Sequence, residues 1–572
     1  MKQSSRKTTN YAIASVIAVF VVGLLLAFKG DKRNFEVVKN LDIFFSLFKE
    51  LNLSYVDEVD SKKLIRTAAD NMLSSLDPYT TFIAEEDMDD FKLQTTGEYG
   101  GVGSIVQMSD TSQYIMIREI YPNLPAHQAG LRPGDLFVEV GGVDVQNKSV
   151  SQVSELLRGK PDTDVKIKVI RDGKTIDVTV HRKTIQLNAV PYSGMLDETT
   201  GYILLTSFTA NCCNEVEKAF KNLRSQGAKQ MVIDLRSNPG GLLDEALKMV
   251  NLFVPKGSLI LNTKGRLHAL DRSYTATRIP VDTVMPLVVL INRASASASE
   301  IVAGALQDHD RAVVIGQRSF GKGLVQTTRE LEYNNAIKLT TSKYYIPSGR
   351  CIQALDYSHR DESGAVGYVP DSLLSEFKTA HGRKVFDGGG ISPDITMEPE
   401  RDSNVSVALI AFNVPFHYAL KYLRKHPKID NIQSFHISDD DFADFCKYVP
   451  TFRRFEYKSR TSEAIKSLEK AAKADKYYDE NVDIFTSLSE KMKPNLEKDL
   501  MTNKKEIVEL IENEIITALY YRAGGIEYNL KSDIEVAEAK KVLNDMERYR
   551  GLLDGTVESH AGDKPRATKE TE

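Results

Sequence analysis

The sequence of 572 residues predicts a multidomain protein in which an α/β core is joined to a smaller β domain and to helical segments at both ends. From residue 202 to residue 316, short β-branched runs alternate with helix-forming segments, a pattern typical of a parallel sheet covered by helices. Residues 164–180 contain two alternating strands around Asp172-Gly173, which predicts a tight hairpin. Residues 462–474 and 504–521 are charged and helix-forming, so we expect a helical C-terminal extension.

The N-terminus predicts a membrane anchor. Three basic residues precede an uncharged apolar run from Tyr11 to Phe28. About 18 residues at a rise of 1.5 Å nearly cross a hydrocarbon core of about 30 Å. No small-x-small cleavage site follows, which favours an uncleaved signal anchor over a removed signal peptide. Although basic residues also follow the run, the positive-inside rule places residues 1–10 in the cytoplasm. We therefore expect a single-pass protein of the cytoplasmic (inner) membrane, with the rest of the chain in the periplasm or extracytoplasmic space.

Residues 34–93 are expected to form two or three helices. Apolar side chains such as Val37, Leu41 and Phe44 recur at helical spacing. Such a face fits either a core or a homodimer interface, and the helical C-terminal extension is a second candidate for dimerisation.

Composition limits the possible partners. The net charge is −5, and no basic stripe is interleaved with aromatic residues, which argues against a nucleic-acid binder. No Cys/His spacing typical of zinc sites occurs, so we expect neither a metal nor another cofactor.

The most informative stretch carries serines at positions 295, 297 and 299. The apolar run Val284–Ile291 before it predicts a buried strand, and Ser299–Leu306 after it has the apolar spacing of a helix. The serines therefore lie on a strand-to-helix turn. Ser297 and Glu300 also form a capping-box pattern, and taken alone this favours a helix cap without chemistry.

A lysine follows about 25 residues later. Residues 308–316 predict a return strand, and a strand–helix–strand unit can bring Lys322 back beside the serine turn. A lysine activates a serine only if its surroundings keep the amine neutral. Gln326 falls on the same face as Lys322 in a strand or a helix, so it could hold the amine. Alone, a lysine between two glycines is more often a solvated turn.

Together these residues resemble a known family. Ser-Ala-Ser-Ala-Ser-Glu at 295–300, followed by Phe-Gly-Lys-Gly-x-Val-Gln at 320–326, is similar to the signature of the C-terminal processing (tail-specific) proteases. The resemblance implies a crotonase-like α/β core and a serine endopeptidase that recognises and cleaves C-terminal regions of extracytoplasmic proteins. It assigns Ser297 as the nucleophile and Lys322 as its base. In the same family a glutamine occupies the position of Gln326.

A glycine pair precedes the serine turn by about 55 residues. Gly240 and Gly241 lie between a predicted strand and a predicted helix, where free backbone N–H groups can bind an anion. A plain turn is the simpler explanation. The family resemblance assigns one of these glycines, together with the amide of Ala298, to an oxyanion hole. The sequence leaves open which glycine donates.

A second glycine-rich stretch lies upstream. Tyr99-Gly100-Gly101-Val102-Gly103 is not followed by a long helix, which argues against a dinucleotide site. With the strands that follow, it resembles a PDZ domain, whose glycine loop presents backbone N–H groups to a peptide's C-terminal carboxylate. We therefore expect the partners to be protein substrates that offer free C-terminal tails.

The predicted domain boundaries follow from these patterns. They are a cytoplasmic tail and transmembrane anchor at 1–33, a helical segment at 34–95, a PDZ domain at 96–185, a protease core at 186–400, a helical extension at 401–554 and a disordered tail at 555–572. Two alternatives stay open: a catalytically silent, membrane-anchored PDZ adaptor, and a Ser-His-Asp protease. The second lacks a Gly-x-Ser-x-Gly motif, and its candidate histidine, His309, lies in a charged cluster.

Overall fold

A computed structural model describes residues 32–564 except Thr111, 361–363, Glu400, 453–454, 456 and 458. The chain divides into two compact units, residues 1–84 and 85–572. The predicted signal anchor, Tyr11–Phe28, lies outside the described residues. Among the helices that are described, none is both long and apolar enough to cross a membrane.

The first unit contains the helices predicted near the N-terminus. Its elements are α2 (Lys32–Ser54), α3 (Ser61–Ser74) and the short strand β1 (Thr81–Ile83). Asp60 begins α3, because its side chain accepts the backbone N–H of Lys63 at 3.0 Å. Phe35 and Phe45 of α2 are 71% and 68% exposed, so the apolar face of this helix is open.

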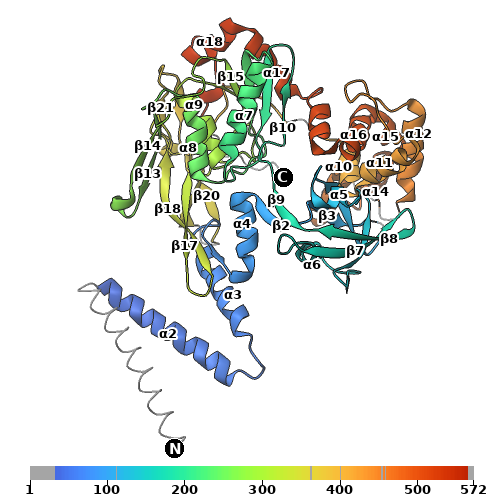
Figure 1. Ribbon diagram of the computed structural model, residues 1–572, viewed down its shortest axis with the longest axis horizontal. Coiled ribbons are helices and arrows are strands. Elements are labelled where there is room, and N and C mark those ends of the chain that lie inside the picture. The colour runs from blue at the N-terminus through green and yellow to red at the C-terminus, as the bar shows by residue number, and fades with distance from the viewer. Residues whose placement is uncertain are drawn as a thin grey trace, which may run out of the picture. The chain divides into compact units, whose positions relative to one another are not determined.

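The second unit begins with a 3₁₀ turn (Glu85–Asp87) and α4 (Met88–Thr96) and continues into the β domain (Figure 1). One sheet has the order β3-β4-β5-β7-β8, with β6 paired to β5, and a separate pair joins β2 to β9. The elements are β2 (Glu98–Gly101), β3 (Ser104–Met108), β4 (Ile115–Ile120), α5 (Pro125–Gln128), β5 (Leu136–Val140), β6 (Val143–Asp144), α6 (Val150–Leu157), β7 (Asp164–Arg171), β8 (Lys174–His181) and β9 (Lys183–Gln186). Asp172 and Gly173 form the predicted hairpin turn with φ of 50° and 75°. Because β3 is an edge strand, its outer hydrogen-bonding side is open to a further strand.

The α/β domain is built on the sheet β10-β11-β12-β15-β16-β23, in which only β10 runs antiparallel. Helices α7, α8 and α9 pack on one face and α17 and α18 on the other. Neighbouring strand residues such as Val288 and Val289 face opposite sides, so both must be apolar. The bounds are β10 (Tyr192–Met195), β11 (Thr200–Leu204), α7 (Cys212–Ser225), β12 (Gln230–Asp234), α8 (Leu243–Asn251), β15 (Leu287–Ile291), α9 (Ala298–Asp308), β16 (Val313–Gly316), β23 (Ile395–Thr396), α17 (Ile534–Asn544) and α18 (Met546–Asp554).

A second sheet completes this domain. Strand β18 pairs with β17 and with β13, and β13 pairs with β14. These strands are β13 (Leu259–Gly265), β14 (Arg272–Thr275), β17 (Leu324–Glu330) and β18 (Ala336–Tyr345), and the short pairs β19 (Leu355–Arg360) with β20 (Val366–Tyr368) and β21 (Glu376–Lys378) with β22 (Lys384–Phe386) follow. The loop before β17 carries Lys322, so this sheet fixes the place of the lysine.

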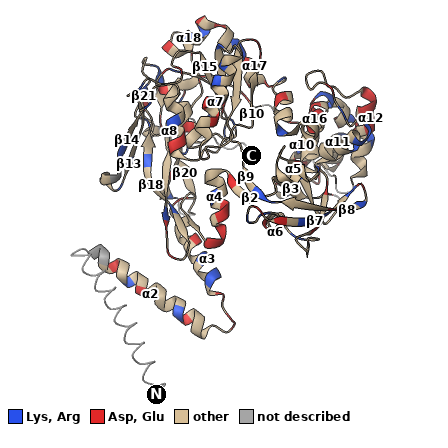
Figure 2. Cartoon of the chain, viewed as in Figure 1, with Lys and Arg blue, Asp and Glu red and all other residues tan. Residues whose placement is uncertain are grey.

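The helical extension has its own apolar core. Its helices are α10 (Asn404–Ala411), α11 (Val414–Lys425), α12 (Asp439–Tyr448), α13 (Arg460–Ala474), α14 (Val482–Lys491), α15 (Leu496–Thr502) and α16 (Lys504–Asn529). Acidic and basic segments are interspersed over these helices, as at the acidic first turn of α12 (Figure 2). Part of the tail predicted to be disordered has defined contacts, since Ser559 and His560 hydrogen-bond to Asp394.

Candidate active site

The three serines differ in what their side chains do. Ser295 Oγ donates to the carbonyl of Leu235 at 2.8 Å, and Ser299 Oγ donates to the carbonyl of Asn238 at 2.9 Å. Both serines are fully buried, whereas Ser297 is partly exposed. Of the three, Ser297 is therefore the one whose side chain can be approached from solvent.

Ser297 lies on the predicted strand-to-helix turn, between β15 and α9. It is the N-cap of α9, which confirms the helix-start prediction, and it has φ 55° and ψ −112°. A positive φ is uncommon for a residue other than glycine and requires surrounding structure to hold it. Glu300 supplies part of that support, because its Oε2 accepts the Ser297 backbone N–H at 2.8 Å.

The same carboxylate holds the lysine loop. Glu300 Oε2 also accepts the backbone N–H of Lys322 at 2.9 Å, while Oε1 accepts Gly321 N–H at 2.7 Å and Ser319 Oγ–H at 2.5 Å. Two donors that share one oxygen lie within about twice a hydrogen-bond length of each other. The structure therefore brings the backbones of Ser297 and Lys322 together, as the strand–helix–strand argument predicts.

A tyrosine forms a second bridge between the two segments. Tyr344 Oη lies 2.6 Å from the carbonyl oxygen of Lys322 and 3.3 Å from that of Ser297. Tyr344 is 1% exposed in β18, the strand paired with β17. The Ser297 and Lys322 backbones are thus fixed through their N–H groups by Glu300 and through their carbonyls by Tyr344.

Sequence reasoning assigned neither bridge. Glu300 was recognised only as a capping residue, and nothing in the local sequence marks Tyr344. Glu300 is fully buried, and this burial raises its pKa from 4.5 to about 7 despite the four donors around it. The buried carboxylate of Glu300 therefore positions the backbones of Ser297 and Lys322, and this role is visible only in the folded structure.

The glycine pair lies against the serine turn. A Cβ on Gly240 would fall 2.8 Å from Ser297 Cβ and 2.9 Å from the Ala298 nitrogen, and φ is 98°. The Gly240 N–H donates to Asn238 Oδ1 at 2.9 Å. Gly241 forms a parallel β-bridge with Phe208. In this bridge the Phe208 N–H donates to the Gly240 carbonyl, and the Phe208 carbonyl accepts the Leu242 N–H. The bridge therefore does not use the Gly241 N–H.

Gln326 lies in β17, four residues after the lysine. Its Nε2 donates to Thr340 Oγ1 of β18 at 3.2 Å. This bond fixes the glutamine side chain to the neighbouring strand.

The histidine of the alternative protease reading lies at the other end of α9. His309 is the C-cap of this helix of 11 residues, whereas Ser297 is its N-cap. At 1.5 Å per residue the two caps are about 18 Å apart. A His309 nitrogen instead bonds to the Leu259 carbonyl at 2.7 Å. His309 therefore cannot act as the base for Ser297 in this structure.

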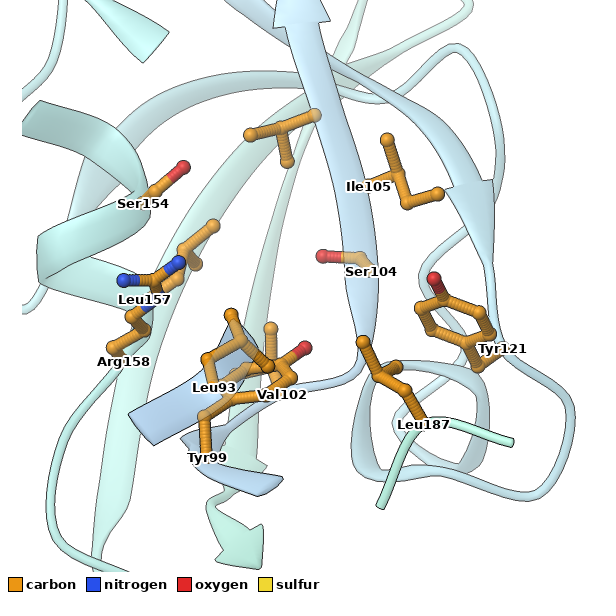
Figure 3. Close-up of a pocket in the computed structure, with 11 residues that line it drawn as sticks. Leu93, Tyr99, Val102, Ser104, Ile105, Tyr121, Ser154, Leu157, Arg158 and Leu187 are labelled. Carbon is orange, nitrogen blue, oxygen red and sulfur yellow. The ribbon is translucent and has the colours of Figure 1, made fainter. Parts of the chain in front are cut away.

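The β domain carries a peptide-sized groove with a volume of about 250 Å³ (Figure 3). Ser104 and Ile105 of β3 line it, with Leu157 and Arg158 at the end of α6 on the other side. Ser104 Oγ is buried and has no hydrogen-bond partner among the described residues. An open edge strand beside such a groove can accept a peptide as an additional strand.

The predicted glycine loop is only partly at this groove. Tyr99 and Val102 line it, and burial raises the pKa of Tyr99 to about 12. Gly100 and Gly101 belong to β2 and pair with Thr184 and Lys183 of β9. Gly103 has φ 78° and makes the turn into β3. The glycine motif therefore marks the entrance to β3. No sequence pattern indicated that the end of α6 lines the other side of the groove.

No metal centre is evident at either site. Among the residues described, no group of three or more His, Cys, Asp or Glu side chains could hold a metal ion.

Comparison with known proteins identifies the domains that carry these residues. Peptidase family S41 matches residues 199–358, a PDZ domain matches residues 116–171, and the C-terminal helical domain of a probable PDZ-protease matches residues 405–543. A carboxy-terminal-processing protease of Bartonella bacilliformis is 37% identical over 346 residues, which cover 59% of this chain and 76% of that protein.

Two further matches are similar. A probable CtpA-like serine protease of Staphylococcus aureus is 34% identical over 346 residues, covering 60% of this chain and 67% of that protein. The solved photosystem II D1 C-terminal processing protease is 27% identical, with a TM-score of 0.34 over 62% of this chain and 92% of that chain. On the identity to the curated relatives and the family match, the chain belongs to peptidase family S41 and carries a PDZ domain and a helical C-terminal domain.

Proposed function

We propose that this serine protease cuts C-terminal regions of extracytoplasmic proteins, with Ser297 as the nucleophile and Lys322 as the general base. The observation that carries this proposal is the shared hydrogen bond at Glu300 Oε2, which holds the Ser297 and Lys322 backbones together. A hydroxyl nucleophile requires an adjacent base, and the lysine is the candidate that the fold brings close.

The reaction is acyl transfer to serine. Neutral Lys322 takes the proton from Ser297 Oγ as the oxygen attacks the peptide carbonyl carbon. The tetrahedral intermediate collapses when the C–N bond breaks and the lysine ammonium returns the proton to the leaving amine. Lysine then deprotonates a water molecule, which hydrolyses the acyl-enzyme and regenerates Ser297.

The oxyanion would be bound by the amide of Ala298 and by a glycine amide. Ala298 is the first residue of α9, so the N-terminal end of the helix favours negative charge there. The Gly240 N–H already donates to Asn238, whereas the bridge to Phe208 leaves the Gly241 N–H unused. Gly241 is therefore the favoured donor, and Gly240 permits the close approach of the two segments.

The PDZ groove would bind the substrate's C-terminal tail. Edge strand β3 offers main-chain hydrogen bonds, and Ser104 Oγ is a polar group without a partner among the described residues. Val102 and Gly103, at the entrance to β3, would present backbone N–H groups to a terminal carboxylate.

The decisive experiment compares Ser297→Ala and Lys322→Ala with the wild-type chain. Each substitution should reduce cleavage of a protein with an apolar free C-terminus by at least about 10³-fold, because both groups act in bond breaking. Circular dichroism and thermal unfolding should show an intact fold. Near-wild-type turnover in Lys322→Ala would refute the dyad.

A companion substrate with an amidated C-terminus tests tail recognition. Amidation removes the carboxylate that the PDZ groove would bind, so cleavage should fall. Binding of tails without any cleavage by the wild-type chain would instead support the silent adaptor.

We also propose that residues 11–28 anchor the protein in the inner membrane with its catalytic domain on the extracytoplasmic side. The apolar length of that run and the basic residues before it support this placement. The open apolar face of α2 supports dimerisation. Protease accessibility in spheroplasts and the mass of the full chain in detergent test the two proposals.

A further inference from the structure

A cavity of about 570 Å³ borders the PDZ groove. Its volume falls within the range of ligand pockets, roughly 300–1,000 Å³. Leu93, Tyr121 and Leu187 line both the groove and the cavity, so the two spaces share a wall. The groove and the cavity are therefore adjacent.

A second wall of the cavity leads toward the turn between β15 and α9 that carries Ser297, called the catalytic turn below. Thr206, Ser207 and Thr209 line the cavity. Phe208, which lies between them, donates its N–H to the Gly240 carbonyl at 2.9 Å and accepts from Leu242 N–H at 2.8 Å. The segment that borders the cavity is thus bonded directly to the loop that carries the proposed oxyanion glycine.

The helical extension supplies a third wall, formed by residues 520–523 of α16. Helical geometry is interrupted here, because Tyr521 has φ 61° and ψ −172°. Its hydroxyl lies 2.8 Å from Nε2 of His127 in the PDZ domain. A non-glycine residue with positive φ persists only where surrounding contacts hold it, and such positions cluster at functional sites.

Three polar groups of this lining have no partner among the described residues. Arg522 is exposed and Glu119 is half-buried, and in the described part of the chain neither side chain has a hydrogen-bond or ion-pair partner. Thr209 is 8% exposed, and its hydroxyl also lacks a partner in the described part of the chain. A buried hydroxyl without a partner costs free energy that a ligand can recover.

We propose that this cavity binds the substrate segment between the PDZ-bound C-terminus and the bond that is cut, and that Arg522 favours an acidic side chain in that segment. An extended polypeptide offers N–H and C=O groups to Glu119, Thr209 and Arg522. The inference rests on the proposed function and gives the helical C-terminal domain a part in substrate selection.

Peptide binding to the full chain carrying Ser297→Ala tests the proposal without turnover. Two peptides share one apolar C-terminus: a short one of about 5 residues, which spans a strand the length of β3, and a long one of about 15 residues. The long peptide is made with neutral, acidic or basic side chains upstream. The long acidic peptide should bind about fivefold more tightly than the long basic one, the effect expected of one exposed ion pair.

Arg522→Glu should reverse that preference and leave the affinity of the short peptide unchanged. The matched control is Arg550→Glu, because Arg550 is an exposed arginine of α18 that does not line the cavity. Equal affinities of the short and long peptides, or an equal effect of Arg550→Glu, would overturn the inference. Loss of short-peptide binding or of wild-type cleavage would instead count against the proposed function.

Discussion

Around Ser297, four donors converge on one buried carboxylate, whereas on β3 of the PDZ domain Ser104 Oγ and Gln107 Nε2 have no partner among the described residues. The polar groups around Glu300 have hydrogen-bond partners without substrate, whereas in the described part of the chain these two groups of β3 do not. Chemistry needs groups held in place before substrate arrives, since reorganisation would add to the barrier. Recognition of a tail needs an open strand edge that the tail itself completes.

The comparison predicts that small changes in the catalytic turn have large effects. Gly240→Ala should have the largest, because its Cβ would collide with Ser297 Cβ and the Ala298 nitrogen. Displacing the proposed nucleophile and the proposed oxyanion donor should lower kcat by about 10³-fold, as loss of an oxyanion donor alone costs 10²- to 10³-fold. Single-turnover cleavage measures this effect.

Gly257→Ala is the matched control for backbone strain. Gly257 has φ 92°, close to the 98° of Gly240, but nothing lies within 4 Å of its added Cβ. It should lower the free energy of unfolding by about 1 kcal/mol and leave kcat near wild type. Similar kcat losses in the two variants would show that strain, and not the collision at Ser297, is responsible.

Glu300→Gln should be the next most damaging change. A glutamine amide replaces one acceptor oxygen by a donor, which then faces N–H or O–H donors from Ser297, Ser319, Gly321 or Lys322. We expect kcat/KM to fall by about 10²-fold, from the loss of about two charge-assisted hydrogen bonds. Glu215→Gln, at a carboxylate that accepts the Val190 N–H, is the control and should have little effect on activity.

The pH dependence follows from the raised pKa of Glu300. Below about pH 7 the carboxyl is protonated and can no longer accept from all four donors, so wild-type activity should fall there. Because burial raises the folded-state pKa above 4.5, the carboxyl's contribution to stability is full below pH 4.5 and is lost as pH rises through about 7. Thermal unfolding of wild type should therefore lose more stability between pH 5 and pH 8 than Glu300→Gln does, and identical pH dependence would contradict this assignment.

Tyr344→Phe should lower kcat/KM by about fivefold. Its hydroxyl holds the carbonyls of Ser297 and Lys322, and a buried hydrogen bond contributes about 1 kcal/mol. Tyr345→Phe is the matched control, since Tyr345 is the next residue of β18 and faces the opposite side. Equal losses in both variants would exclude a specific role for Tyr344.

The sequence predicted the parts of the catalytic turn that are local or periodic. The apolar run before Ser297 and the helical spacing of apolar residues after it identified β15 and α9. Both signals depend only on residues that are close together in the sequence. The proximity of Lys322 to the serine turn followed from the right-handed crossover of a strand–helix–strand unit, which brings the chain back beside its first strand. The family motif, and not periodicity, selected Ser297 from three serines.

The remaining contacts join residues far apart in the chain. Tyr344 reaches Ser297 across 47 residues because β18 pairs with β17, and no local pattern encodes that pairing. Arg158 of the groove likewise gave no signal, since an arginine after an amphipathic helix is most often solvated. Long-range pairing and the unmet polar groups of the groove become visible only in three dimensions.

The smallest predicted effect concerns the contact between the PDZ domain and the helical extension. Arg118 of β4 bonds to Glu514 of α16 at 2.8 Å and lies 4.2 Å from the ring centroid of Phe416. Arg118→Ala should loosen this contact and reduce tail-dependent cleavage by about twofold to fivefold, because partly exposed ion pairs are weak. Lys168→Ala, which removes a pair within the PDZ domain, is the control. Cleavage of an amidated substrate should be unchanged in both variants, since the catalytic turn carries its own supports. An equal loss on amidated and free-tailed substrates would mean that the helical extension acts on the catalytic turn itself and not through the peptide groove.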